Sequence, residues 1–236
     1  MKPAAIAILL LAFTSAAHAA PLIDFSEGPS VALSPLYPAQ ESKILGQLFT
    51  SYVKDYAKCP AGDAASGTEV ILSDVQAIRG NFSSLSQDDL VLIFKSVDCN
   101  GGHAGEHANV ALVRNGAVID ARQDLSTELA YKTLDTDADG LLEVIATASY
   151  SNMGYSGRWA QTITFKGGQA REISYVQGTV HYDDCGLDGK TEGEYDAVFF
   201  AGAAGAQPEQ KNYRRACGAD AKGFKFYSSG KLDKEL

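Results

Sequence analysis

From residue 70 onward the chain consists largely of short apolar segments separated by turn-forming residues, a pattern typical of β-strands. The clearest example is Asn115-Gly116, which lies between apolar runs at 110–113 and 117–119. Asn-Gly in this position is the strongest short-range signal for a β-hairpin, because both residues adopt the positive φ angles of a type I′ turn. Gly167-Gly168 predicts a second hairpin over 159–176. Further strands are expected at 70–82, 90–97, 142–149, 194–201 and 223–227. The pattern therefore predicts a mainly β fold built from antiparallel hairpins.

One segment before these strands has helical spacing instead. Its apolar residues form a single stripe, namely Ile44, Leu45, Leu48, Phe49, Tyr52, Val53 and Tyr56. This spacing predicts an amphipathic helix over 39–57 that packs on the core and ends before Cys59-Pro60. Four of the seven prolines lie between Pro21 and Pro38, so we expect an extended arm over 20–38. Residues 39–236 are expected to form one β-rich domain that begins with the helix.

The N-terminus has the pattern of a secretory signal. Lys2 precedes a short apolar run at 4–13, and Ala17-His18-Ala19 forms a small-x-small cleavage site. Residues 1–19 are therefore interpreted as a signal peptide, and the protein is expected in the periplasm or outside the cell. No later segment has the roughly 18 apolar residues of a membrane-spanning helix. The formal net charge of −9 argues against nucleic acid as a partner, because such proteins present a basic face.

An even number of cysteines in an exported chain indicates disulfide bonds. The four are Cys59, Cys99, Cys185 and Cys217. Pairing of sequence neighbours, Cys59–Cys99 and Cys185–Cys217, is the preferred arrangement, although the other pairings remain open. A zinc site formed by the four thiols is less consistent with the sequence, because no C-x-x-C pair occurs and the compartment is oxidising.

The most distinctive chemical motif is an acidic loop at residues 135–143. It places three aspartates at alternate positions, then Gly140, then a glutamate: Asp135, Asp137, Asp139 and Glu143. Ca²⁺ takes about six to eight hard oxygen ligands, and short acidic side chains on a sharply turning backbone supply them. Asp and Gly also favour solvated turns without a metal. Four carboxylates so close together would repel one another without a counter-ion, however, and this favours a bound cation.

The loop is not an EF-hand, because the twelfth position is Ala146 instead of glutamate and a strand is expected after it. Over residues 134–165 it resembles the calcium loops of FG-GAP and VCBS repeats, which form the blades of integrin-type β-propellers. In that family Asp-x-Asp-x-Asp-Gly-x-x-Asp/Glu leads directly into a buried strand. The resemblance implies a structural Ca²⁺ held by Asp135, Asp137, Asp139, Glu143 and the backbone carbonyl of Leu141. Irregular repeat spacing and the limited chain length imply a partial or degenerate β-propeller.

A second motif, His103-Ala104-Gly105-Glu106-His107, fits the H-x-x-E-H pattern of inverted zinc peptidases. That chemistry needs both histidines on one helical face. Gly101, Gly102 and Gly105 make a helix unfavourable here, so we expect a loop, although metal binding by His103 and His107 stays open. The sequence therefore favours an exported, calcium-stabilised binding or interaction protein without enzymatic activity, whose partner is an unidentified exported protein or envelope component. The alternative is a secreted zinc-dependent hydrolase that uses residues 103–107.

Overall fold

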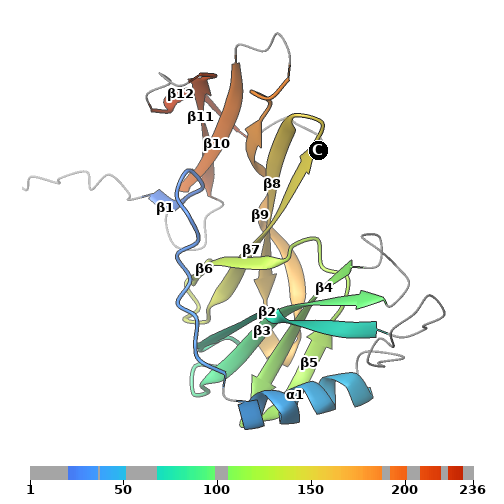
Figure 1. Cartoon of the computed structure of the whole chain (residues 1–236). Coiled ribbons are helices and arrows are strands. Elements are labelled where there is room, and N and C mark those ends of the chain that lie inside the picture. The colour runs from blue at the N-terminus through green and yellow to red at the C-terminus, as the bar shows by residue number, and fades with distance from the viewer. Residues whose placement is uncertain are drawn as a thin grey trace, which may run out of the picture.

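The computed structural model describes residues 21–36, 38–51, 68–98, 106–187, 192–200, 208–218 and 223–230. Within these ranges the protein is mainly β, with one α-helix, as the hairpin pattern predicts (Figure 1). The helix is α1 (Pro38–Ser51), and a short 3₁₀ turn, η2, covers Lys166–Gly168. The strands are β1 (Pro21–Asp24), β2 (Thr68–Gly80), β3 (Asp89–Asp98), β4 (Glu106–Arg114), β5 (Ala117–Arg122), β6 (Leu129–Leu134), β7 (Glu143–Asn152), β8 (Tyr155–Thr164), β9 (Arg171–Asp183), β10 (Glu192–Phe200), β11 (Glu209–Ala216) and β12 (Lys225–Ser229).

These strands form two antiparallel sheets. The smaller sheet has the order β2-β3-β4-β5. The larger one runs β12-β11-β10-β9-β8-β7-β6, and β1 pairs with β10. Strands β7, β8 and β9 extend from the body that contains α1 toward β10, β11 and β12 at the top of the view (Figure 1). No described helix is long and apolar enough to cross a bilayer.

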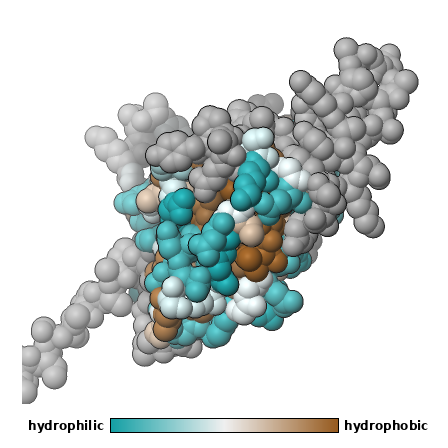
Figure 2. Space-filling model, turned by 90° about the horizontal axis from the view of Figure 1, so that it is seen from below, coloured by the Kyte–Doolittle hydropathy of each residue, from teal (hydrophilic) through white to brown (hydrophobic). Residues whose placement is uncertain are grey.

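The smaller sheet is buried on both faces. One face packs its Leu92, Phe94 and Ala111 against Ile44 and Leu48 of α1. The other face packs against β7 and β8 of the larger sheet through a cluster that includes Val91, Ile93, Val110, Leu112, Val144, Ala146 and Ile163. Because successive side chains of a strand point to opposite faces, burial on both sides explains the uninterrupted apolar run in β3. On the side of the molecule seen from below, near α1, described hydrophilic residues cover much of the surface and hydrophobic residues form patches between them (Figure 2).

The N-terminal arm packs on the outer face of the larger sheet. Its Ile23 and Phe25 join a cluster with Tyr131, Ile145, Ala160, Val176 and Val180. The Tyr131 hydroxyl lies 2.9 Å from the carbonyl oxygen of Asp24 and 2.5 Å from that of Glu27. Further along, the Ser34 N–H donates to the carbonyl of Ala77 in β2 at 2.7 Å. The arm therefore lies along the domain and contacts both sheets.

Both predicted hairpins are present. Asn115 and Gly116 have φ angles of 51° and 75° and join β4 to β5, as a type I′ turn requires. The second hairpin joins β8 to β9 through η2, where Gly167 and Gly168 also have positive φ. The strands expected from 70–82, 90–97, 142–149, 194–201 and 223–227 correspond to β2, β3, β7, β10 and β12.

Three strands, β1, β6 and β11, have no counterpart in the sequence-based prediction. Strand β11 shows why, since its inward positions are polar: Gln210 and Asn212 are 7 % and 2 % exposed. The Asn212 side-chain amide donates to Ser228 Oγ at 3.1 Å and to the Gly230 carbonyl at 2.8 Å. Buried amides that are hydrogen-bonded in this way remove the apolar alternation by which strands are recognised.

The predicted Cys185–Cys217 disulfide is present and connects the turn after β9 to the end of β11. Cys59 and Cys99, and the signal peptide predicted at 1–19, lie outside the described residues. The helix begins one residue before the predicted start. Its predicted continuation over 52–57 also lies outside the described residues.

Candidate metal centre

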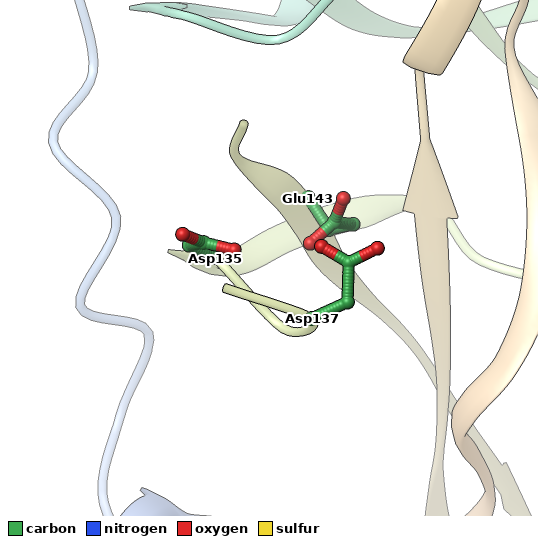
Figure 3. A group of neighbouring side chains, drawn as sticks. All are labelled: Asp135, Asp137 and Glu143. Carbon is green, nitrogen blue, oxygen red and sulfur yellow. The ribbon is translucent and has the colours of Figure 1, made fainter. Parts of the chain in front are cut away.

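The acidic loop connects β6 to β7, which are neighbours in the larger sheet. Carboxylate oxygens of Asp135, Asp137 and Glu143 lie within 4.8 Å of one another. Figure 3 shows Asp137 and Glu143 pointing toward each other from the loop and from the start of β7, with Asp135 beside them. Carboxylate oxygens gathered in this way form a donor set for a hard divalent cation.

Hydrogen bonds from the loop backbone hold the carboxylates in place. The Gly140 N–H donates to Asp135 Oδ2 at 2.9 Å, and the Leu141 N–H donates to Asp139 Oδ1 at 2.8 Å. Gly140 has a φ of 86°, a conformation that suits glycine because it lacks Cβ. A Cβ at Gly140 would also lie 2.6 Å from Leu85 Cδ2. Gly140 therefore permits both the sharp turn of the loop and its close packing against the β2–β3 connection.

Glu143 is the buried member of the group. Its side chain is 3 % exposed, and its Oε2 accepts hydrogen bonds from the Thr136 N–H and hydroxyl at 2.8 and 2.7 Å. Burial raises the pKa of Glu143, the bonds from Thr136 oppose this rise, and the negative charges of Asp137 and Asp139 add to it. Among the described residues no lysine, arginine or histidine forms an ion pair with Glu143. A cation bound between the carboxylates would supply the missing positive charge.

Lys166 is a feature of the site that the sequence did not indicate. It belongs to the β8–β9 connection, and its ammonium group lies 2.5 Å from Asp139 Oδ2 and 3.6 Å from Asp137 Oδ2. The hydrogen bond to Asp139 raises the pKa of Lys166 and lowers the pKa of Asp139. In the sequence, its position directly before Gly167-Gly168 indicates only that it lies in a turn. The contact with Asp139 joins residues 27 positions apart, so no local pattern predicts it.

The predicted ligands therefore fall into two groups. The structure brings together Asp135, Asp137 and Glu143, whereas Asp139 faces Lys166 and the backbone of Leu141. The roles of Asp139 and of the Leu141 carbonyl as metal ligands stay predictions. The loop also contacts the β2–β3 connection, because the Leu142 N–H donates to the carbonyl of Asn81, directly after β2, at 2.8 Å.

The described part of the alternative centre at residues 103–107, namely Glu106 and His107, is not helical. Glu106 and His107 begin β4, and neighbouring strand residues point to opposite faces. His107 Nδ1 lies 2.6 Å from Asp124 Oδ1, and His103 lies outside the described residues. The expected loop is replaced at Glu106 and His107 by the first residues of a strand, because β4 pairs with β3 up to Glu106.

Comparisons of the chain with protein-family models, with curated proteins and with solved structures find no match. The resemblance to FG-GAP and VCBS repeats therefore rests on the loop pattern alone.

Proposed function

We propose that the protein is an exported binding or interaction protein without enzymatic activity, stabilised by a Ca²⁺ ion in the acidic loop. The main support for the metal site is the environment of Glu143. This buried carboxylate has a raised pKa and lies beside Asp135 and Asp137. Among the described residues it has no cationic partner. All the donors are oxygens, which suits Ca²⁺ or Mg²⁺ better than zinc. Ca²⁺ is favoured because it accepts an irregular arrangement of several carboxylates, whereas Mg²⁺ demands near-octahedral geometry.

The loop position supports a structural role for this ion. The loop joins two strands of the larger sheet and hydrogen-bonds to Asn81, the first residue of the β2–β3 connection of the smaller sheet. An ion that binds only the folded state adds its binding free energy to the free energy of unfolding, about 2.7 kcal/mol when the ligand exceeds its Kd a hundredfold. Binding of Ca²⁺ here would stabilise the contact between the sheets, and recognition would take place on the surrounding surface.

We also propose that the loop and β7 form an FG-GAP-type blade entry in a partial or degenerate propeller. Support comes from the spacing of the loop residues and from β7, which begins at Glu143 itself. Export to the periplasm or the medium is part of the proposal. The signal-like N-terminus and the Cys185–Cys217 disulfide support it.

Calorimetric titration of chelator-treated protein with CaCl₂ tests the metal site. We expect saturable binding near one equivalent for the wild type and at least about tenfold weaker binding for Asp137→Ala, because each ligand charge adds to calcium affinity. Asp88→Ala is the matched control, since Asp88 is an exposed aspartate whose ion-pair partner among the described residues is Arg79, away from the acidic loop. Equal heats for the wild type and Asp137→Ala would reject the site. Stronger binding of MgCl₂ than of CaCl₂ would reject calcium as its ion.

A further inference from the structure

A second polar site lies on the outer face of the larger sheet, away from the acidic loop. A pocket of about 300 Å³ opens there, lined by residues of β7, β8 and β9. Its lining includes Ser149, Ser151, Ser156, Arg158 and His181. This volume is at the lower end of the range for small-molecule pockets.

Strand register places the polar side chains of this pocket on one face. Ser149 of β7 pairs with Arg158 of β8, Arg158 pairs with His181 of β9, and His181 pairs with Asp196 of β10. Directly paired residues share a face of the sheet, as do residues two positions apart in one strand. Ser151 and Ser156, which pair with each other, therefore lie on the same face as this row.

Arg158 is held by the N-terminal arm and by the ring of Tyr131. Its Nη1 donates to the Phe25 carbonyl at 3.2 Å, and its guanidinium carbon lies 5.8 Å from the centre of the Tyr131 ring. Among the described residues no carboxylate forms an ion pair with Arg158. A guanidinium has several N–H groups in a planar fork that matches the oxygens of carboxylate and phosphate. The arm and Tyr131 therefore position a positive charge in the pocket without neutralising it.

His181 is oriented by a buried carboxylate. Its Nδ1 contacts Oδ1 of Asp196, which is only 1 % exposed. This contact occupies one ring nitrogen and leaves Nε2 as the nitrogen available to a ligand. Asp183, which pairs with Ser156 on the same face, has its Oδ1 engaged by the Cys185 N–H at 2.8 Å. The described residues that line the pocket are therefore Arg158, His181, three serines, Tyr150 and Gly157, with no carboxylate among them.

Aspartate, histidine and serine in one pocket also raise the alternative of a hydrolase triad. In the described part of the chain, however, no serine hydroxyl is hydrogen-bonded to His181. Ser149 is separated from His181 by the whole of β8, which places the two strands roughly 10 Å apart. A nucleophile needs its base within about 3.2 Å. The arrangement thus favours anion binding over covalent catalysis.

We propose that this pocket binds a small anion through its carboxylate or phosphate group. Arg158 would make the bidentate contact, the serine hydroxyls would donate to the remaining oxygens, and His181 would donate from Nε2 when its ring carries both protons. This site shares no residue with the acidic loop, so its occupation is independent of calcium.

The test uses the full chain in calcium-free buffer and follows the ring resonances of His181 by NMR, with His181→Gln to assign them. Inorganic phosphate and acetate serve as the two probes. We expect saturable shifts of the His181 resonances with at least one of them. Arg158→Gln should weaken binding at least about tenfold, because a charge-assisted hydrogen bond is lost.

A second variant covers the case in which Arg158→Gln fails to fold. Ser149 is exposed, so Ser149→Asp should be tolerated while placing a carboxylate opposite Arg158, and we expect it to abolish the shifts. Ser86→Asp, at an exposed serine in the β2–β3 connection, is the matched control and should bind like the wild type. The proposal is overturned if neither probe gives a saturable shift, or if Ser149→Asp binds as tightly as Ser86→Asp. Loss of calcium binding in Asp137→Ala would leave all of these results unchanged.

Discussion

Glu143 is the residue whose surroundings most favour a bound metal ion. It is the only buried carboxylate of the three that converge in the described acidic loop. Burying a charge without a partner costs free energy, and here the cost appears as a raised pKa. Thr136 satisfies one oxygen by hydrogen bonding, but a hydroxyl and an N–H do not supply positive charge. A bound cation would do so.

Glu143→Gln should separate the charge from the shape of the side chain. The amide oxygen can still accept from Thr136, so we expect the variant to unfold at or above the wild-type temperature in chelator. The calcium-induced rise in Tm should disappear, because the buried charge that binds the ion is gone. Differential scanning calorimetry with and without CaCl₂ measures both effects. A calcium-induced rise as large as in the wild type would contradict the role assigned to Glu143.

At the scale of elements, the start of β3 is anchored by an ion pair that the chain pattern does not reveal. Asp89 is fully buried and accepts hydrogen bonds from Arg114 Nε at 2.9 Å and from the Ser83 N–H at 2.9 Å. Burial alone would raise the pKa of Asp89, but the bonds from Ser83 and Arg114 outweigh it and hold the pKa below its usual value. The pair links the start of β3 to the end of β4, and Ser83 joins the β2–β3 connection to both.

Asp89→Ala should lower the free energy of unfolding by about 3 kcal/mol, because it leaves Arg114 partly buried without its partner. The pH dependence has a definite sign. A lowered carboxyl pKa stabilises the fold above the ordinary aspartate pKa, and this contribution is lost as the pH falls below that value toward the lowered pKa. Urea unfolding of the wild type and the variant at neutral pH and near pH 3 tests this. The difference between them should shrink at the lower pH, and a constant difference would contradict the prediction.

At the scale of the whole molecule, the arm closes the outer face of the larger sheet. Tyr131 joins the two, since its ring packs on Phe25 at 4.9 Å between centroids and its hydroxyl reaches the carbonyls of Asp24 and Glu27. Burial raises the pKa of Tyr131 to about 12, so the hydroxyl remains a donor at neutral pH. The same arm supplies the Phe25 carbonyl that holds Arg158.

Tyr131→Phe keeps the ring and removes the hydroxyl. We expect a loss of about 1 kcal/mol in the free energy of unfolding, the usual contribution of one hydrogen bond. We also expect faster proteolytic cleavage within residues 24–30, because the arm opens more often. Limited proteolysis with mass spectrometry measures the cleavage rate, and Tyr227→Phe, at an exposed tyrosine of β12, is the control. Unchanged cleavage in Tyr131→Phe would show that the aromatic packing alone holds the arm.

The sequence by itself determined the features that depend on neighbouring residues. These are the mainly β class, the type I′ turn at Asn115-Gly116, the stripe of α1 and the acidic loop before β7. Each follows from local backbone preference or from side-chain periodicity, so a short window contains the whole signal.

Only the tertiary structure decided which distant groups meet. It turned Asp139 toward Lys166, buried Glu143 beside Asp135 and Asp137, and aligned Arg158 with His181 and Asp196 through strand register. It also formed β11 around buried amides that give no apolar pattern. The physical reason is that register, burial and ion pairing arise from packing between segments far apart in the chain, where a shift of one residue turns a side chain to the opposite face.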